Sequence, residues 1–559
     1  MDFARGVTSR GGGFMSDRLL GRSHWIWFSG ILVAALVLRL FQIGTEPLWI
    51  DELRTWWFAD KSWDTIWREY PTLEVHPPLY FALMKIWTDL FGDSEATMRL
   101  PAMFFDLGAL FFVYLTAREV AGKENPWAAL AAAALFAAAT QQVAYSQEVR
   151  FYAAFTFAYS LVVFGTVWLL KRPQEIERPV WTSFAQRRAI GAYVSLAVGA
   201  ALLMWFHNLG VLYNLALAVV LVLWWAVRLR FSTPALINLL IVGAVAILFY
   251  TPNLSNFITQ MTNTNSGGYW IEAPSAERLL ELFSFTYGFE RPYSNKLDFG
   301  LTALMVSAGG LGLWFIWQSG NRWLAAAVAI FTAFPFLAAT LITYSLQPVL
   351  LDRTLLPMFA PWSVLVGAVL LSRIRWRAGV VLFGVLLTAS LLYTFDYYSR
   401  DTKEPWRQVV RYVEANAKPD EPVFLVNNIV QIAFDYYLRD GTNELDIRPL
   451  PEAFPANADA YEYPIGGRSE PMLTDTMALE AWKSATAAPS AWLVARGSFR
   501  FEETPDFVEN WFATHSDCKM YAYPDHLNIA IYKYDEPSAE TKHDVPQCGF
   551  DKDVKFLTR

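Results

Sequence analysis

The chain has 559 residues, of which 54% are hydrophobic and 17% are charged, and its mean hydropathy is +0.25. This composition excludes a disordered chain and an ordinary soluble domain, and it predicts an integral membrane protein. The charge is uneven, because residues 396–559 hold 28 acidic and 17 basic residues, a net of −11, whereas the preceding residues carry +4. We therefore expect a membrane part followed by an acidic water-soluble tail, without the basic surface typical of nucleic-acid-binding proteins.

Arginines precede the first apolar run, which covers residues 24–43. The run is long enough to cross a bilayer, and no small-residue cleavage pattern follows it. We therefore expect a retained span and not a cleaved signal peptide. Because basic residues favour the cytoplasmic side of a membrane, residues 1–23 are expected inside and the first loop, 44–99, outside.

The apolar segment at 78–91 is too short to cross a bilayer. Lys85, Thr88 and Asp89 share one face at helical spacing, which predicts an amphipathic helix lying in the outer interface. Residues 51–59 predict a second such helix. If 78–91 does not cross, ten further spans follow, at 100–117, 127–144, 151–170, 189–206, 209–227, 235–251, 300–317, 323–343, 355–371 and 378–395.

This topology of about 11 spans places nearly all the basic loops in the cytoplasm and the tail outside. Counting 78–91 as a span would invert every later loop and break that pattern. The long outer loop that follows the span at 235–251 is rich in Asn, Gly and Thr over 253–268, and then predicts a surface helix at 276–285.

The tail at 396–559 predicts a soluble α/β domain. Helical patterns alternate there with short apolar runs typical of strands: helices at 405–413 and 430–438, and strands at 422–426, 491–495 and 527–532. The two cysteines of the chain, Cys518 and Cys548, predict one disulfide if the tail lies in an oxidising compartment; two unrelated thiols are the alternative. The expected fold class is thus a membrane all-α domain at 24–395 with interfacial helices, followed by this α/β domain.

Polar residues gather in four groups on the expected outer face, at the depth where helices leave the membrane. They are Asp51, Glu52 and Arg54; His76 with Pro77 and Pro78; Tyr145 to Arg150; and Asp352 with Arg353. Each group alone has an ordinary explanation, such as helix-end charges, a helix start, a rim ion pair or a headgroup anchor. Their convergence on one face favours a functional site.

These groups also form an ordered set of motifs. The set comprises Leu48 to Glu52, His76 to Tyr80, Gly92 to Glu95 with Arg99 to Pro101, Tyr145 to Tyr152, and Asp352 to Pro357. Over roughly residues 25–395 the set resembles the integral-membrane glycosyltransferases of the GT-C fold, above all the protein O-mannosyltransferase and lipid A aminoarabinose transferase group.

The resemblance implies a sugar donor linked through phosphate to a polyprenyl chain, with transfer on the outer membrane face to a lipid, glycan or protein acceptor. Asp51 matches the first-loop aspartate of the family, the base, and Glu148 stands where relatives often place a second acidic residue. His76 stands where the aminoarabinose branch has a lysine near the donor phosphate, and this departure leaves the role of His76 open.

The remaining assignments follow the same resemblance. The donor phosphate is expected to contact Arg54, His76, Arg150 and Arg353, and the substrate is expected to contact Tyr145, Tyr152 and His207. Arginine suits a phosphate because its planar fork of donors can meet the charge that grows on the leaving group.

An acceptor hydroxyl is a poor nucleophile, so a carboxylate must take its proton as the new bond forms. Asp51 and Glu52 are adjacent, and on a helix their side chains point about 100° apart. Asp51 aligns with Arg54, whereas Glu52 falls toward Trp56. We therefore assign the proton acceptor to Asp51 and a positioning role to Glu52. One base without a covalent intermediate would invert the anomeric carbon.

Asp51, His76, Glu148 and His207 are residue types that can bind a divalent metal, but no tight ligand spacing supports one, so metal dependence is left open and no cofactor is assigned. Two other classes remain as alternatives. A secondary transporter would place charges near the middle of the membrane and carry an internal repeat. A membrane sensor would not need the acidic first loop. We expect a multi-pass protein of a bacterial inner membrane with a cytoplasmic N-terminus and a periplasmic C-terminal domain.

Overall fold

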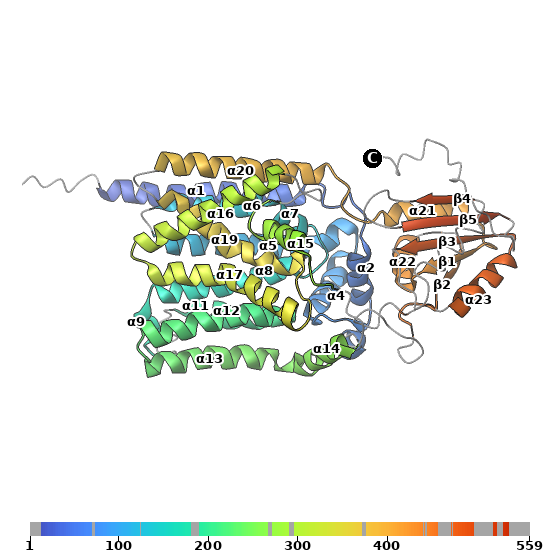
Figure 1. The fold of residues 1–559 in the computed structure, drawn as a ribbon, viewed down its shortest axis with the longest axis horizontal. Coiled ribbons are helices and arrows are strands. Elements are labelled where there is room, and N and C mark those ends of the chain that lie inside the picture. The colour runs from blue at the N-terminus through green and yellow to red at the C-terminus, as the bar shows by residue number, and fades with distance from the viewer. Residues whose placement is uncertain are drawn as a thin grey trace, which may run out of the picture.

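The computed structural model shows a helical bundle with an α/β domain at one end (Figure 1). We call that end of the bundle the domain end. The structure describes residues 13–69, 73–122, 125–179, 189–266, 271–289, 296–371, 376–439, 441, 444–456, 471, 473, 475–496, 518–521 and 529–535.

Eight helical segments in the described part of the chain are long and apolar enough to cross a membrane. They contain α5 (Glu95–Ala121), α8 (Tyr152–Leu170), α12 (Gly210–Leu223), α13 (Thr233–Tyr250), α16 (Lys296–Gln318), α17 (Arg322–Ser345), α18 (Asp352–Leu355) with α19 (Phe359–Gly367), and α20 (Trp376–Tyr398). Each coincides with one of the expected spans, so the chain is a multi-pass membrane protein.

The three other expected spans are helical as well. Residues 24–40 of α1 (Gly13–Leu40) and α11 (Ile190–Phe206) are shorter apolar helices, and 127–144 is a bent pair, α6 (Pro126–Ala138) and α7 (Thr140–Ser146). The fold class expected from the sequence is therefore confirmed.

The bend of 57° between α6 and α7 is a feature that the sequence pattern did not predict. Neither proline nor glycine lies at Ala139, where the backbone turns extended. The carbonyls freed by the break find side-chain donors, because Arg39 Nη1 lies 3.0 Å from the Ala137 oxygen and Thr394 Oγ1 lies 2.9 Å from the Ala138 oxygen. A break at membrane depth is tolerated when such donors satisfy the backbone.

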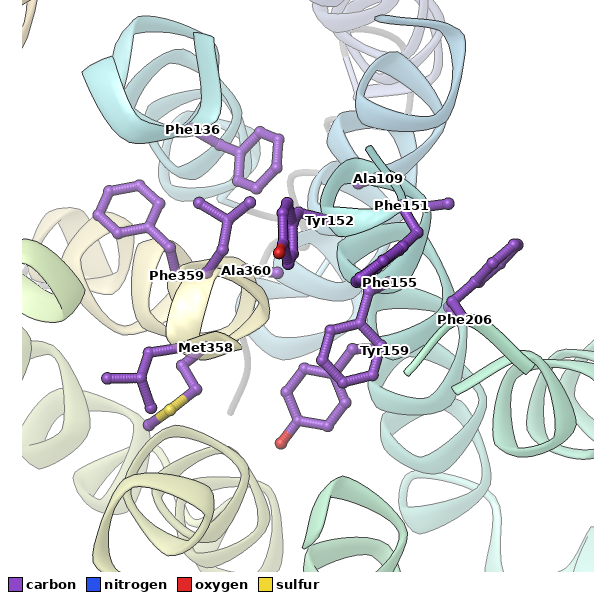
Figure 2. Packing of buried hydrophobic residues seen from close by; sticks show 14 of the residues in the cluster. Ala109, Phe136, Phe151, Tyr152, Phe155, Tyr159, Phe206, Met358, Phe359 and Ala360 are labelled. Atoms are coloured by element: carbon purple, nitrogen blue, oxygen red, sulfur yellow. The ribbon is translucent and has the colours of Figure 1, made fainter. Parts of the chain in front are cut away.

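Small residues let the helices approach closely in the middle of the bundle. A Cβ on Gly312 of α16 would lie 1.8 Å from the backbone oxygen of Leu365 on α19, so these two helices touch backbone to backbone. Aromatic rings fill the wider gaps: Figure 2 shows Phe155 and Tyr159 on α8 in the space beside the segment that carries Met358.

Short helices cap the domain end of the bundle. They are α2 (Ile50–Ala59), α4 (Leu79–Phe91) and α15 (Ala276–Tyr287) (Figure 1). The sequence predicted the first two as amphipathic interfacial helices and the third as a surface helix. One expectation was wrong over the described residues 253–266, which do not form an open loop. A 3-10 turn at Thr251–Asn253 continues α13 into α14 (Leu254–Ser266). Leu254, Phe257 and Ile258 recur at helical spacing there, which outweighs the polar composition.

The α/β domain contains α21 (Trp406–Asn416), α22 (Gln431–Leu438) and α23 (Asp475–Thr486) around a five-stranded sheet of order β2-β1-β3-β5-β4. Its strands are β1 (Pro422–Val426), β2 (Asp446–Pro449), β3 (Ser490–Arg496), β4 (Cys518–Tyr521) and β5 (Ile529–Asp535). β1 runs parallel to both β2 and β3, whereas β5 pairs antiparallel with β3 and β4. Cys548 lies outside the described residues, so the disulfide stays a prediction.

Candidate active site

Helix α2 begins with the two carboxylates that the sequence singled out, and they point in different directions. The backbone N–H of Trp49 donates to Glu52 Oε2 at 3.3 Å, which closes the first turn of the helix, where negative charge is favoured. Asp51 is 22% exposed, whereas the Glu52 carboxylate is fully buried. Only one of the two can therefore meet a substrate.

Glu52 joins four parts of the chain. Arg99 of α5 donates from Nε to Oε1 at 2.9 Å and from Nη2 to Oε2 at 2.8 Å, and Lys403 donates to Oε1 at 2.9 Å. The backbone N–H of Val149 completes the set at 2.9 Å. Burial alone would raise the pKa of Glu52, but Arg99 and Lys403 lower it to about 2. The side chain is thus a fixed anion that positions α2 against its neighbours.

Asp51 faces an arginine that lies 302 residues further along the chain. Arg353 Nη1 lies 3.1 Å from Asp51 Oδ2, and Arg150 Nη1 lies 3.4 Å from the Asp51 carbonyl oxygen. Burial acts to raise the pKa of Asp51, but Arg150, Arg353 and Arg54 outweigh it and hold the pKa below its ordinary value. Asp51 is therefore an ionised carboxylate, partly open to solvent, in a basic surrounding.

A second group lies around Glu74, a residue that the sequence analysis did not single out. Its carboxylate is 3.0 Å from Arg54 Nε and 2.6 Å from His76 Nδ1. The His76 ring packs against Phe151 and, with centroids 5.1 Å apart, against His207. Burial, the largest influence on both imidazoles, lowers the pKa of His76 and of His207, so both rings are neutral at pH 7.

Glu148 lies in the turn between α7 and α8 and differs from the other carboxylates. It is 8% exposed, and its Oε1 has no hydrogen-bond partner within the described residues. Burial raises its pKa to about 7, because Lys403 and Arg353 offset only part of the desolvation cost and Glu52 and Asp51 repel its charge. A carboxyl that titrates near neutral pH and has a free oxygen can bind or exchange a proton.

Two tyrosines connect these groups. Arg353 lies over the ring of Tyr152 at 5.8 Å, and the Tyr152 ring packs edge-on against Tyr145 at 5.4 Å. Figure 2 shows Tyr152 beside Phe151 at the start of α8. The structure thus brings all ten residues singled out from the sequence into one connected region at the domain end.

The residues that sequence reasoning missed hold this region together. Lys403 and Glu404 come from the junction between α20 and the α/β domain, and Glu404 accepts hydrogen bonds from the Ile50 N–H at 3.0 Å and from Arg496 at 2.7 Å. Of the residues around Glu52, Arg99 could have been found from the sequence, because it belongs to the motif that runs from Gly92 to Pro101. In the described part of the chain, no cluster of three or more His, Cys, Asp or Glu side chains is arranged to hold a metal ion.

No protein-family model matches the chain, and no curated protein matches it. Solved structures do. ArnT from Cupriavidus metallidurans in the apo state is 14% identical at a TM-score of 0.56, over 92% of this chain and 98% of that chain. The same protein bound to undecaprenyl phosphate is 14% identical at a TM-score of 0.55, over 91% and 98%. The Archaeoglobus fulgidus oligosaccharyltransferase tethered with an acceptor peptide is 12% identical at a TM-score of 0.51, over 85% and 69%.

The fold is therefore that of the GT-C membrane glycosyltransferases, as the motifs indicated. Within this class the similarity to ArnT extends over nearly the whole length of both chains, and so it takes in the α/β domain as well as the bundle.

Proposed function

We propose that this protein is a glycosyltransferase that moves a sugar from a polyprenyl-phosphate donor to an acceptor hydroxyl, with Asp51 as the base. The observation that carries the proposal is an ionised, partly exposed Asp51 held 3.1 Å from Arg353 at the domain end of the bundle. A base for the hydroxyl and a cation for the phosphate are the two groups that this reaction needs.

The donor phosphate is proposed to bind between Arg353, Arg150 and Arg54. A similar fold bound to undecaprenyl phosphate supports a lipid-linked donor. When a phosphate occupies this place, Arg353 shares its charge between phosphate and Asp51, so the pKa of Asp51 rises toward the value of a useful base. The same arginine then meets the negative charge that grows on the leaving phosphate.

The proposed reaction has one step, in which Asp51 receives the proton directly from the acceptor. The acceptor oxygen attacks the anomeric carbon while Asp51 takes its proton, the bond from sugar to phosphate breaks, and the lipid phosphate leaves. Attack from the side opposite the phosphate inverts the anomeric carbon. Glu52 keeps Asp51 in place, and Glu74 holds Arg54 and His76 beside the phosphate.

We place this reaction on the periplasmic face of a bacterial inner membrane. The positive-inside pattern supports that orientation, because Arg172 directly precedes α9 (Pro173–Ile176), which lies at the end of the bundle opposite the α/β domain (Figure 1). A transporter is less consistent with these charges, which lie at helix ends and not at mid-membrane. The acceptor hydroxyl belongs to a lipid, a glycan or a protein.

The test is single-turnover transfer from a radiolabelled polyprenyl-phosphate sugar to a membrane extract by purified protein in nanodiscs. Asp51→Asn keeps shape but loses basicity, so its rate is expected to fall about 10²–10⁴-fold with donor binding kept. Asp89→Asn on α4, an exposed carboxylate, is the matched control and should transfer at the wild-type rate. Full activity of Asp51→Asn would refute the base, and counterflow in vesicles without transfer would favour a transporter.

A further inference from the structure

A cavity of about 310 Å³ opens at the domain end, next to the charged region but separate from its histidines. Its walls come from α7, α15, α19 and α20, and its rim from Arg400 and Thr402 in the segment that leads to the α/β domain. His76, Glu74, Arg54 and His207 contribute nothing to its lining. The bend at Ala139 produces one wall, because it turns α7 away from the axis of α6.

The lining combines aromatic rings with uncharged hydrogen-bonding groups. Tyr145, Phe285 and Tyr393 provide ring surfaces, and Thr140 and Gln141 provide a hydroxyl and an amide. Apolar walls with a few well-placed polar groups are typical of small-molecule sites, and this volume is near their lower limit. The C–H face of a sugar ring packs well on an aromatic ring, while its hydroxyls suit amide and hydroxyl partners.

The charged side chains around the cavity are paired with side chains of opposite charge. Arg400 Nη2 is 2.6 Å from Asp396 Oδ2, so its positive charge is already paired, and Asp352 adds a carboxylate to the lining. Asp352 in turn lies 3.8 Å from Arg278. Among the described residues that line the cavity, a phosphate would meet the Asp352 carboxylate, and the one cation, Arg400, already has an anionic partner. A neutral, hydroxyl-bearing group fits this balance better than a phosphate does.

The cavity also has a direct connection to the proposed base. Tyr145 in its wall packs against Tyr152, which lies under Arg353, and Arg353 pairs with Asp51. The carboxylate of Asp352, also in the wall, accepts a hydrogen bond from the backbone N–H of Arg353 at 2.7 Å. Tyr152 and Arg353 therefore stand between the cavity wall and Asp51, so a sugar ring held in the cavity would be the part of the acceptor next to the reacting hydroxyl, which extends past these two residues to Asp51.

We infer that this cavity binds the neutral sugar ring of the acceptor. The inference rests on the proposed function and specifies its acceptor as a glycan or glycolipid, in place of a protein side chain.

The test measures binding without turnover, in nanodiscs, by saturation-transfer NMR. Methyl β-D-glucopyranoside and octyl β-D-glucopyranoside serve as sugar probes without and with a lipid anchor, and undecaprenyl phosphate is the donor-side probe. Ala144→Phe fills the cavity, and Leu392→Phe, on the exposed face of α20, is its control. Gln141→Ala removes an amide without adding bulk, so the test survives if Ala144→Phe fails to fold.

Ala144→Phe is expected to weaken glucoside binding at least tenfold, and Gln141→Ala severalfold, with undecaprenyl phosphate binding within twofold of wild type. Binding of both glucosides points to a free glycan, and binding of the octyl form alone points to a glycolipid. The inference is overturned if neither glucoside binds, if Leu392→Phe causes the same loss, or if only undecaprenyl phosphate binding falls. If the wild-type protein binds glucoside but not undecaprenyl phosphate, the proposed function is refuted, while the conclusion that the cavity binds a sugar ring still holds.

Discussion

Replacing Glu52 by glutamine is expected to destabilise the protein more than any other conservative change at the candidate site. The substitution keeps the size of the side chain but leaves Arg99 and Lys403, with side chains 2% and 9% exposed, without their shared anion. Breaking a buried ion pair by removing one partner costs about 3–5 kcal/mol. The lowered pKa of Glu52, about 2 against 4.5, gives a similar figure of about 3 kcal/mol.

The pH dependence follows from the same shift. Because folding lowers the pKa of Glu52, its contribution is fully present above about pH 4.5 and is lost as the pH falls toward 2. The unfolding temperatures of wild type and Glu52→Gln in the same detergent should therefore differ strongly at pH 7, and the difference should shrink below about pH 4.5 as the pH falls toward 2.

The control for this measurement is Asp89→Asn, which removes an exposed carboxylate 3.5 Å from Lys85 on α4. A surface pair of this kind contributes about 0–1 kcal/mol, so its unfolding temperature should match wild type. If Glu52→Gln unfolded at the wild-type temperature, the buried network would not be holding α2, and the positioning role of Glu52 would be wrong.

Three further results are expected. Arg353→Ala should lower single-turnover transfer sharply and Arg353→Lys should restore only part of it, because lysine lacks the two-pronged donor; equal rates for all three forms would move the phosphate site elsewhere. Ionisation of Glu148 above about pH 7 should weaken binding of a polyprenyl-phosphate sugar, because the new negative charge repels the phosphodiester, which does not titrate in this range. Glu148→Gln lacks that charge and should bind with constant affinity from pH 6 to 8. In a cysteine-free background, an impermeant maleimide added to whole cells should label Asp89→Cys, and should label Ser319→Cys at the opposite end of the spans only after permeabilisation; the reverse pattern would invert the topology.

The sequence predicted what depends on local composition. Hydropathy was enough for the eight described helical segments that are long and apolar enough to cross a membrane, and for the helices that contain Asp51 and Lys85, because each pattern is complete within about 20 residues. The ordered motifs then brought Asp51, Arg150 and Arg353 to one face. The predicted topology alone was enough to assign these three residues to the same region.

Long-range contacts explain what the sequence did not predict. Glu74 became visible only when the fold placed Arg54 and His76 on its two oxygens. The break at Ala139 depends on donors that lie 98 and 256 residues away from the carbonyls they satisfy. Helix α14 is fixed by Gln260, which donates to the His76 carbonyl oxygen at 2.6 Å. No pattern confined to one segment contains that information.

The hydrogen bonds around Glu52 also set an order of assembly during synthesis. Arg99 emerges 47 residues after Glu52, and Val149 97 residues after it, but Lys403 follows only after 351. Tyr437, whose hydroxyl oxygen accepts a hydrogen bond from the Leu48 N–H, emerges later still. A ribosome must therefore complete every span and begin the α/β domain before α2 acquires its full set of contacts. Until then the nascent chain lacks part of the hydrogen-bond network that holds α2 at the candidate site.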